Sequence, residues 1–458
     1  MGRIPRRGFV CFTALFLGLA LLAAAEEPLA QGSLAQGPLG ESRGTLSLDR
    51  AVELALEQSL DLQKEFIDLK TAGVSASNLW AEIFPTISAG GGLNYATPLF
   101  TDPGFQADGN LLGYNVSLGV TFRLASSLSS SMKLLKLAYQ AELLSYENSR
   151  RQLEIQTAKT FFGLIAEKRN LVNLENTGAQ AERQLEKNRI AFNNGLVSQV
   201  VVLQSSLAVE NARLNLSNAE TLYASHRRDF LVLLGLDGGA DVELEGEIDI
   251  ERIEVDSGQL LAEYLVKRPD IVSQRQTIEG LELTRKQITL NARAPSLSLS
   301  TQWRGSGNAA GAGGFTDSLS ASLSVDIPIA GWISGTGGQN GGQAVQAAKA
   351  NVEKAKLDLK NTENQARAEI QSLSENLRNS WTSVEIARLQ VALAEQTYEL
   401  SEQGFRSGVT ESLVLENARN SLAEARQQLL EVELSYMTMI LDLAGALNID
   451  WHELSNIK

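Results

Sequence analysis

Residues 114–124, YNVSLGVTFRL, alternate apolar side chains with polar or small ones along their whole length. Successive side chains of a strand point to opposite faces, so this segment predicts a strand with one apolar face. The stretches 98–113 and 305–314 are expected to be external loops. Three more segments carry the same period-two pattern, the last of them weakly because it is rich in glycine: residues 296–304, 318–329 and 86–96.

Strands with one apolar and one polar face fit two kinds of sheet. One is a soluble antiparallel sheet that buries its apolar face, and the other is a membrane β-barrel around a wet lumen. The polar faces are rich in serine and four strands build only a small core, which favours the barrel. Aromatic residues near the strand ends would then lie at the membrane interface: Tyr95, Tyr114, Trp303 and Trp332.

Two long stretches without proline follow the strands. Residues 128–235 and 342–446 are rich in Ala, Leu, Glu, Gln, Lys and Arg, which favour helix. Asn193-Asn194-Gly195 and Ser407-Gly408 interrupt them, so each stretch predicts a helical hairpin with a glycine turn. The first arm of each hairpin would run roughly 65 residues, or about 100 Å, a length typical of coiled coils. One stripe of the second hairpin is expected to collect Leu357, Ile370, Leu373 and Leu377.

The chain is a tandem repeat. Leu60-Asp61-Leu62 and Pro269-Asp270-Ile271 each open a helix that ends at a strand-starting proline, Pro85 or Pro295. The two prolines lie 210 residues apart and the glycines Gly195 and Gly408 lie 213 apart, so both halves keep the same order of elements. We assign the first repeat to residues 45–256, with an equatorial segment at 236–256, the second repeat to 257–448, and a C-terminal tail to 449–458.

The first 25 residues have the composition of a secretory signal peptide. Arg3, Arg6 and Arg7 precede an apolar run, and Ala23-Ala24-Ala25 fits a cleavage site. A transmembrane anchor is the competing interpretation, but the apolar run is short and no charge cluster follows it. Residues 26–44 predict a flexible lead-in.

Composition excludes several functions. Cys11 is the only cysteine and lies in the predicted signal peptide, which excludes disulfides, thiol catalysis and a lipid anchor at the cleavage point. Removal of residues 1–25 takes away three arginines and no acids, so the formal net charge moves from −14 to −17. Such an acidic chain is not expected to bind nucleic acid. No further apolar run reaches the length of a membrane-spanning helix, so lipid contact would fall to the strands.

No cofactor, metal or catalytic site is expected. His226 and His452 are the only histidines, and neither has ligands at metal-binding spacing. The glycine-rich run 335–342 lacks the Lys-Ser/Thr that ends a phosphate-binding loop. The many carboxylates alternate with Lys and Arg, as expected for the solvated face of a coiled coil.

The number of strands per chain predicts the oligomeric state. Two strands per repeat give four per chain, and an open four-stranded sheet would expose unpaired edges to lipid. Eight strands leave an interior filled by side chains, whereas twelve leave an aqueous lumen. The sequence therefore predicts a homotrimer of an α+β membrane protein, with a twelve-stranded barrel continuous with a long α-helical coiled-coil barrel.

Several segments resemble the TolC-like outer membrane efflux family. They are the turns at 191–197 and 404–410, Arg268-Pro269-Asp270, the strand end at 326–329 and the run 416–419. Their order and duplication over residues 45–448 carry the resemblance, since no single motif is specific. It implies a passive trimeric exit duct in the outer membrane with a periplasmic extension, in a tripartite efflux or type I secretion system. Its partners would be a periplasmic adaptor protein and an inner-membrane transporter.

The resemblance assigns a role to the two turns. Family members contact the adaptor through a Val-Gly-Leu type of turn. Turn formation alone explains both glycines without any partner, and since a turn is also able to dock, both interpretations remain. The corresponding residues here are Asn194, Gly195 and Leu196 in the first repeat and Ser407, Gly408 and Val409 in the second.

The family's closed gate is matched less well. In its best-known member a tyrosine, an arginine and acidic residues close the tunnel. We expect instead a more apolar constriction around Phe405 and Val414, with Glu411 and Glu416 as the only nearby acids, although packing between helices explains both apolar residues equally well. The positions that correspond to the gate hold Phe405, Thr410, Val201, Val414 and Asn417.

Two other functions fit parts of the sequence. A stand-alone porin would devote most of its length to strands, whereas most of this chain is expected to be helix. A periplasmic coiled-coil scaffold would not require four alternating segments. A passive duct accounts for both features, and its cargo would be selected by the transporter.

Overall fold

The computed structural model describes residues 44–79, 83–95, 112–308, 315–328 and 338–454. The signal peptide expected at 1–25 and Trp332 lie outside the described residues. The chain divides into two units, Met1–Gly44 and Thr45–Lys458, and nearly all described residues belong to the second. In chain order the elements are β1 (Gly44–Leu46), α2 (Leu48–Gln58), α3 (Leu60–Ser77), β2 (Thr86–Tyr95), β3 (Leu112–Leu124), α4 (Leu128–Asn193), α5 (Gln199–Leu233), β4 (Val242–Leu244), α6 (Ser257–Tyr264), η2 (Leu265–Lys267), α7 (Pro269–Arg293), β5 (Ser296–Asn308), β6 (Thr316–Asp326), α9 (Gly338–Arg406), α10 (Ser412–Leu447) and α11 (Trp451–Leu454).

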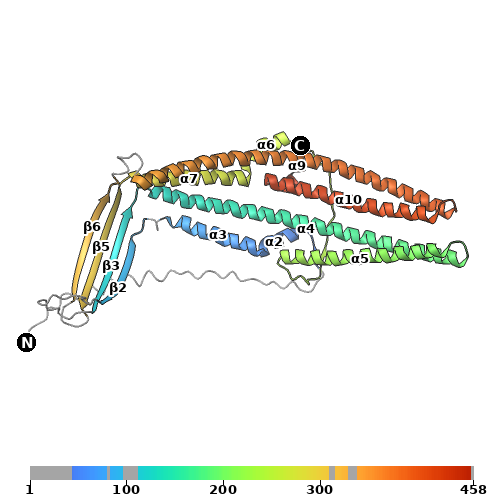
Figure 1. Cartoon of the computed structure of the whole chain (residues 1–458), viewed down its shortest axis with the longest axis horizontal. Coiled ribbons are helices and arrows are strands. Elements are labelled where there is room, and N and C mark those ends of the chain that lie inside the picture. Colours follow the sequence, from blue (N-terminus) through green and yellow to red (C-terminus); the bar gives the residue numbers. More distant parts are fainter. Residues whose placement is uncertain (1–43, 80–82, 96–111, 309–314, 329–337, 455–458) are drawn as a thin grey trace, which may run out of the picture. The chain divides into compact units, whose positions relative to one another are not determined.

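Four strands form one antiparallel sheet in the order β2-β3-β5-β6 (Figure 1). Val120 of β3 pairs with Ile87 of β2 and with Thr301 of β5, and Thr301 pairs with Ala321 of β6. Paired residues share a face, so the apolar positions of all four strands lie on the same side. The two repeats meet between β3 and β5, which leaves β2 and β6 as the edges.

Strand β5 is longer than the sequence predicts. Residues 305–314 were expected in a loop, but Gly305 to Asn308 continue the strand. A Cβ on Gly305 would collide with the ring of Phe315, and one on Gly307 with the ring of Tyr114. These glycines make room for aromatic rings of neighbouring chain segments, and their composition alone does not distinguish them from loop glycines. Strand β6, expected at 318–329, begins two residues earlier, at Thr316, and ends three residues earlier, at Asp326.

The helices stand side by side in four columns. Helix α4 packs on α3 and α5, and also on α7 and α10, while α9 packs on α7 and α10. Figure 1 shows α3 roughly in line with α5, and α7 roughly in line with α10. The column order is therefore α3/α5, α4, α7/α10, α9, which matches the strand order β2, β3, β5, β6. Strand β2 and the α3/α5 column therefore lie at one edge of the unit, and strand β6 and helix α9 lie at the other.

Local capping fixes the helix starts. The side chains of Ser47 and Ser59 accept hydrogen bonds from the backbone N–H groups of Arg50 and Leu62, at the starts of α2 and α3. Pro269 stands in the first turn of α7, where its missing N–H costs nothing. Helices α3 and α7 therefore begin at equivalent positions of the two repeats.

Each hairpin has an ion pair between its own two helices, at equivalent positions of the two repeats. Arg213 of α5 contacts Glu182 of α4 at 2.8 Å, and Arg426 of α10 contacts Glu395 of α9 at 2.7 Å. Both residues of the second pair lie 213 positions after their counterparts in the first. This spacing equals that of the two tip glycines, and the tandem repeat is confirmed at the level of side-chain contacts.

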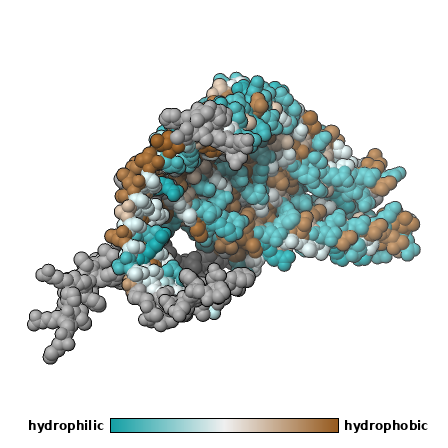
Figure 2. Space-filling model, turned by 60° about the vertical axis from the view of Figure 1, so that its left-hand side comes forward, coloured by the Kyte–Doolittle hydropathy of each residue, from teal (hydrophilic) through white to brown (hydrophobic). Residues whose placement is uncertain are grey.

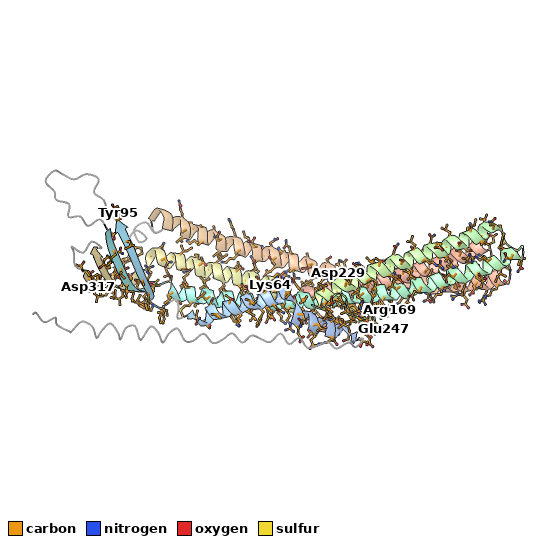
Figure 3. The ribbon with its side chains drawn as sticks, turned by 90° about the horizontal axis from the view of Figure 1, so that it is seen from below. Lys64, Tyr95, Arg169, Asp229, Glu247 and Asp317 are labelled. Carbon is orange, nitrogen blue, oxygen red and sulfur yellow. The ribbon has the colours of Figure 1, made fainter. Side chains whose placement is uncertain are left out.

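The main hydrophobic core lies where the short elements β1, α2, β4, α6 and α11 pack on the long helices. The Tyr436 hydroxyl in this core donates to the Glu251 carbonyl and accepts from the Ile253 N–H, both at 3.0 Å. The segment predicted as a C-terminal tail contributes as well: Leu454 is fully buried and Trp451 meets Phe162 edge to face. Glu247 lies in the same middle region, whereas Tyr95 and Asp317 lie at the sheet (Figure 3).

Among the helices that the structure describes, none combines the length and the apolar character needed to cross a bilayer.

Candidate functional site

Both hairpins turn through the same backbone motif at their tips. At the first tip the Gly195 N–H donates to the Phe192 carbonyl and the Leu196 N–H to the Ala191 carbonyl, each at 2.8 Å. The second tip repeats these two bonds 213 residues later, from Gly408 to Phe405 and from Val409 to Gly404. Both glycines have a positive φ, 72° and 78°, as this C-terminal capping motif requires. Turn formation is therefore sufficient to explain the two glycines.

The residues after the glycines project from the tips. Leu196 is 75% exposed and Val409 is 84% exposed, so each tip ends in an apolar side chain that is not packed within the chain. Asn194 is also exposed. Ser407 is bound locally, because its hydroxyl donates to the carbonyls of Gln403 and Gly404 at 3.1 and 3.0 Å.

The residues expected at a constriction do not form one cluster within a single chain. Phe405 is half-buried and lines a pocket with Tyr398 and Leu415, whereas Val414 is 48% exposed. Thr410 and Val201 are half-buried. Asn417 is exposed, as is Glu411, which stands at the N-cap position of α10 without a capping hydrogen bond from its side chain. Phe405 thus packs between helices here, and Val414 is free to face a neighbouring chain or a lumen.

The outer column helices each carry two apolar stripes. The sequence predicts a single stripe on α9, but only some of its members are buried: Ile370 is 0% exposed and Leu377 1%, whereas Leu357 is 68% exposed. Leu357 belongs to a second, outward stripe that sequence periodicity does not separate from the first. We call this the α9 edge stripe, and it consists of Leu357, Ile386, Leu389, Leu393 and Leu400.

The opposite edge has a matching stripe. Its members follow heptad-like spacings of three, four and seven residues on α3 and α5, and each is more than half exposed. The buried residues of the same helices, such as Leu69 and Val209, lie on the other side. We call this the α3/α5 edge stripe, and it consists of Leu60, Ile67, Val74, Val200, Leu203, Leu207 and Leu214.

The sheet has two faces of opposite character. On one face hydroxyl groups pair across strands, as in Ser298 with Ser324 and Ser300 with Ser322, both at 2.7 Å. The other face is apolar and remains exposed, and Figure 2 shows brown surface along the side of the sheet and again at the helical tips. A continuous apolar sheet face of this kind marks contact with lipid or with protein. Its exposed large side chains include Ile87, Leu93, Val116, Leu118, Val120, Leu299, Leu319, Leu323 and Val325.

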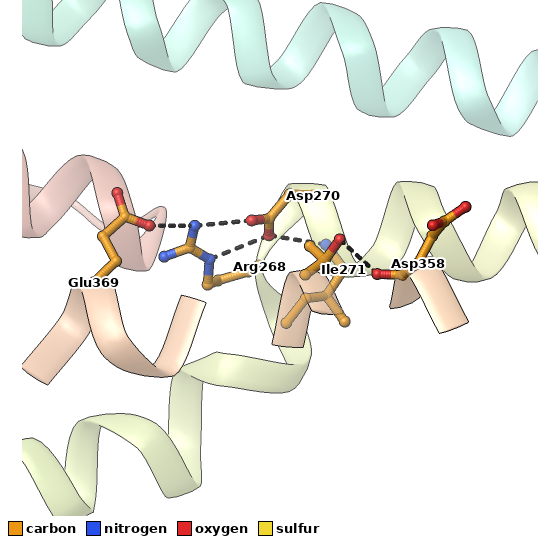
Figure 4. A network of polar contacts seen from close by, with 6 residues as sticks. Arg268, Asp270, Ile271, Asp358 and Glu369 are labelled. Carbon is orange, nitrogen blue, oxygen red and sulfur yellow. Dashed lines mark hydrogen bonds and ion pairs between the residues drawn. The ribbon is translucent and has the colours of Figure 1, made fainter. Parts of the chain in front are cut away.

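Arg268 links α7 to α9. Its guanidinium donates to both oxygens of Asp270, at 3.1 and 2.8 Å, and to Glu369 of α9 at 2.8 Å (Figure 4). Burial by itself lowers the pKa of Arg268, but the two carboxylates outweigh it and the pKa is raised, so the buried group stays charged. The sequence identified Arg268 only within a family motif. Its partner Glu369 lies about a hundred positions away, and no local spacing points to it.

Both histidines contact carboxylates. Nδ1 of His226 lies 2.6 Å from Glu167 on α4, and Nδ1 of His452 lies 3.0 Å from Asp450. Within the described ranges no three His, Cys, Asp or Glu side chains gather as a metal site would require. The contact of His226 joins the two helices of the first hairpin.

Comparison with known proteins agrees with this geometry. The family model described as "Outer membrane efflux protein" matches residues 51–236 and 260–448. The antibiotic efflux pump outer membrane protein ArpC and the toluene efflux pump outer membrane protein TtgC, both of Pseudomonas putida, are 25% identical over 430 residues, covering 89% of this chain and 84% of each relative. The outer membrane channel CmeC of Campylobacter jejuni superposes with a TM-score of 0.71 at 18% identity, over 87% of this chain and 85% of that one.

A four-stranded sheet with an exposed apolar face, helical columns and two glycine-tipped hairpins together define an outer-membrane channel protein of the efflux type. The chain belongs to the outer membrane efflux protein family. It is an exit duct located in the outer membrane with a periplasmic extension, and the predicted α+β fold is confirmed.

Proposed function

We propose that identical copies of this chain close side by side into one duct. The observation that carries the proposal is that the unit has two unfinished edges. Among the described strands, β2 and β6 each have a neighbour on one side only. The columns continuous with them carry the α3/α5 edge stripe and the α9 edge stripe, which are apolar and exposed. One copy's α9 edge would cover the α3/α5 edge of the next.

Such a contact joins two different surfaces, and contacts of this type form a ring when the rotation from one copy to the next closes. Three copies would bring twelve strands together, enough for an aqueous lumen, whereas two would leave a filled interior. The apolar sheet face would then meet lipid, and the serine-rich face would line the lumen. The helical columns would prolong the lumen into the periplasm.

We also propose that the hairpin tips dock a periplasmic adaptor, which connects the duct to an inner-membrane transporter. The exposed Leu196 and Val409 support this, because two apolar side chains at the far end of the periplasmic helices lack a partner within the chain. The tip residues Asn194, Gly195, Leu196, Ser407, Gly408 and Val409 would form the contact. The relatives named above serve antibiotic and toluene efflux pumps, so we propose small organic molecules as cargo.

We further propose that the duct narrows near the hairpin tips. In the closed ring Val414, together with Asn417, would face the lumen near its narrow end, and Phe405 would pack behind it. Single-channel recordings of Val414→Asp test this. A ring of introduced carboxylates should make the pore sensitive to block by hexamminecobalt, and an unchanged cation block would contradict the assignment.

Disulfide crosslinking tests ring closure. Leu214 lies nineteen residues after Gly195 and Leu389 nineteen residues before Gly408, so the two should face each other across the contact between copies. The only native cysteine is Cys11, in the predicted signal peptide, which leaves no background thiol in the mature chain. Oxidation of the Leu214→Cys, Leu389→Cys double variant should give covalent trimers. Each single variant should stay monomeric on a denaturing gel, and a ladder that stops at dimers would refute the trimer.

A second experiment tests docking separately. Leu196→Asp and Val409→Asp should abolish export while the trimer still forms and conducts, because both side chains are largely exposed within the chain. Photo-crosslinkers at the same two positions should capture an adaptor protein in cells. Normal export by the double variant would contradict docking at the tips and leave ring closure untouched.

A further inference from the structure

A small pocket lies between the two hairpins in their tip halves. Its volume is about 160 Å³, and α4, α9 and α10 all contribute to its walls. Tyr398 and Phe405 of α9 and Leu415 of α10 form the apolar part. The rest of the lining is polar, and its charged members are Arg183, Lys187, Glu402, Arg406, Glu416 and Arg419.

The pocket is positively charged in an acidic protein. Four of its side chains are cationic and two are anionic, whereas the whole chain carries a formal net charge of −14. One of the two carboxylates is already engaged, because Arg406 donates to Glu402 at 2.7 Å. Arg183 and Lys187 stand four residues apart on α4, a spacing at which like charges repel. With that pair formed, Arg183, Lys187 and Arg419 share one remaining carboxylate, Glu416, so the pocket keeps a net positive charge.

Arg419 is the least compensated of these cations. Its side chain is only 11% exposed, and its closest carboxylate oxygen, in Glu416, is 3.9 Å from Nη2. Its Nε is buried and has no hydrogen-bond acceptor. Removing a guanidinium from water without a close partner is costly, which is why buried charges are normally paired. Arg268, whose side chain is 10% exposed, also has a buried nitrogen without an acceptor, Nη1, but two carboxylates lie at 2.8 Å from its Nη2.

We propose that this pocket binds a small oxyanion, such as sulfate, phosphate or a free carboxylate, between Arg419, Arg183 and Lys187. The volume corresponds to about five water molecules, which accommodates one such anion and is too small for a drug-sized ligand. An oxyanion offers several acceptors to converging arginine and lysine donors. Because the donors come from α4 and α10, the bound anion would hold the first hairpin against the second. This inference does not depend on the proposed trimer or on adaptor docking.

Hydrogen–deuterium exchange of the intact protein in detergent tests the site, with sodium sulfate as the probe and sodium chloride at equal ionic strength as the reference. Local opening is suppressed by the factor 1 + [L]/Kd, so exchange should slow about tenfold at a concentration about nine times Kd. The effect should be confined to peptides from residues 176–193 and 398–420. It should disappear in Arg419→Gln and weaken in Lys187→Gln, whose side chain is exposed and dispensable for folding.

Arg426→Gln is the matched control, because Arg426 is on the same helix but is paired with Glu395 at 2.7 Å. This variant should keep the full sulfate response. Equal slowing in the wild type, Arg419→Gln and Lys187→Gln would overturn the proposal, since it would identify a general salt effect on the fold. The absence of a sulfate-specific response in the wild type would overturn it as well.

Discussion

At the scale of single residues, the tip glycines are required by their backbone conformation and not by space. A Cβ at Gly195 or Gly408 would have no atom within 4 Å, but both have a positive φ. Gly178, in the middle of α4, also has no atom within 4 Å of a Cβ, and its backbone is helical. Replacement of glycine by alanine should therefore lower stability at the tips and raise it within α4.

Gly195→Ala should destabilise the first tip by about 1 kcal/mol, because alanine is strained in the left-handed region. Gly195→Asn should cost less, since asparagine tolerates this region. Gly178→Ala should instead stabilise α4 by about 0.5–1 kcal/mol. Hydrogen exchange of peptides around each site measures all three, and a neutral Gly195→Ala would show that the turn does not need glycine.

Tyr436 holds the segment 251–253 to the core through two backbone hydrogen bonds. Tyr436→Phe leaves both backbone groups without this partner and should lower the free energy of unfolding by about 1–3 kcal/mol. Tyr223→Phe is the control, because Tyr223 is partly buried and its hydroxyl forms no hydrogen bond with the part of the chain that the structure describes. Chemical denaturation followed by circular dichroism gives both values, which should differ clearly.

The Tyr436 hydroxyl should also make the stability of the fold depend on pH. Burial raises the pKa of Tyr436 above its ordinary value of 10.0, although the Ile253 N–H opposes the shift. The folded state therefore keeps the neutral form when the unfolded chain ionises. Its contribution is complete below pH 10.0 and is lost as the pH rises through the raised pKa. The wild type should lose more stability than Tyr436→Phe in this alkaline range.

At the scale of elements, the α9 edge stripe is the feature that indicates contact with another copy of the chain. A helix in the interior of a bundle is apolar all round, whereas α9 has a buried stripe and an exposed one within a single copy. Exposed leucines at coiled-coil spacing are expected to be covered by a partner helix.

Leu393→Asp should prevent assembly of the oligomer, because Leu393 is 66% exposed within one chain and would be buried between copies. Gln390→Asp is the control, since it introduces the same charge about 60° away from Leu393 round the helix and outside the stripe. Size-exclusion chromatography with light scattering distinguishes trimer from monomer. If Leu393→Asp assembles as well as Gln390→Asp, the α9 edge stripe is not the contact between copies.

At the scale of the whole molecule, the two faces of the sheet differ in polarity and therefore suit different surroundings, lipid for one and water for the other. Leu323 is on the apolar face and 68% exposed, and the adjacent Ser322 is on the serine-rich face, where it pairs with Ser300. Neighbouring residues of β6 should therefore differ sharply in their tolerance of charge.

Leu323→Arg should lower the stability of the sheet in a membrane by about 2–4 kcal/mol, because an arginine near the bilayer midplane loses its hydration. Ser322→Arg should cost no more than its hydroxyl pair, about 0.5–1.5 kcal/mol. Folding into lipid vesicles, followed by heat-modifiable mobility on gels, compares the two. Similar yields for both variants would show that the apolar face does not meet lipid.

The sequence by itself determined the elements and their repetition. Alternation in 114–124 and the proline-free stretches predict strands and helices, because both signals depend only on residues close in the chain. The turns at Gly195 and Gly408 follow for the same reason. Resemblance to the efflux family supplied the function, and the family match confirms it.

Only the tertiary structure decided which apolar residues are buried. It separates Leu357 from Ile370 on α9, extends β5 through Gly305 and Gly307, and joins Arg268 to Glu369. It also leaves the Arg419 side chain only 11% exposed, with its nearest carboxylate oxygen 3.9 Å away. Each of these depends on which distant segment a side chain meets. Periodicity records that a residue is apolar or charged, but contacts between residues a hundred positions apart are set by how the helices and strands pack.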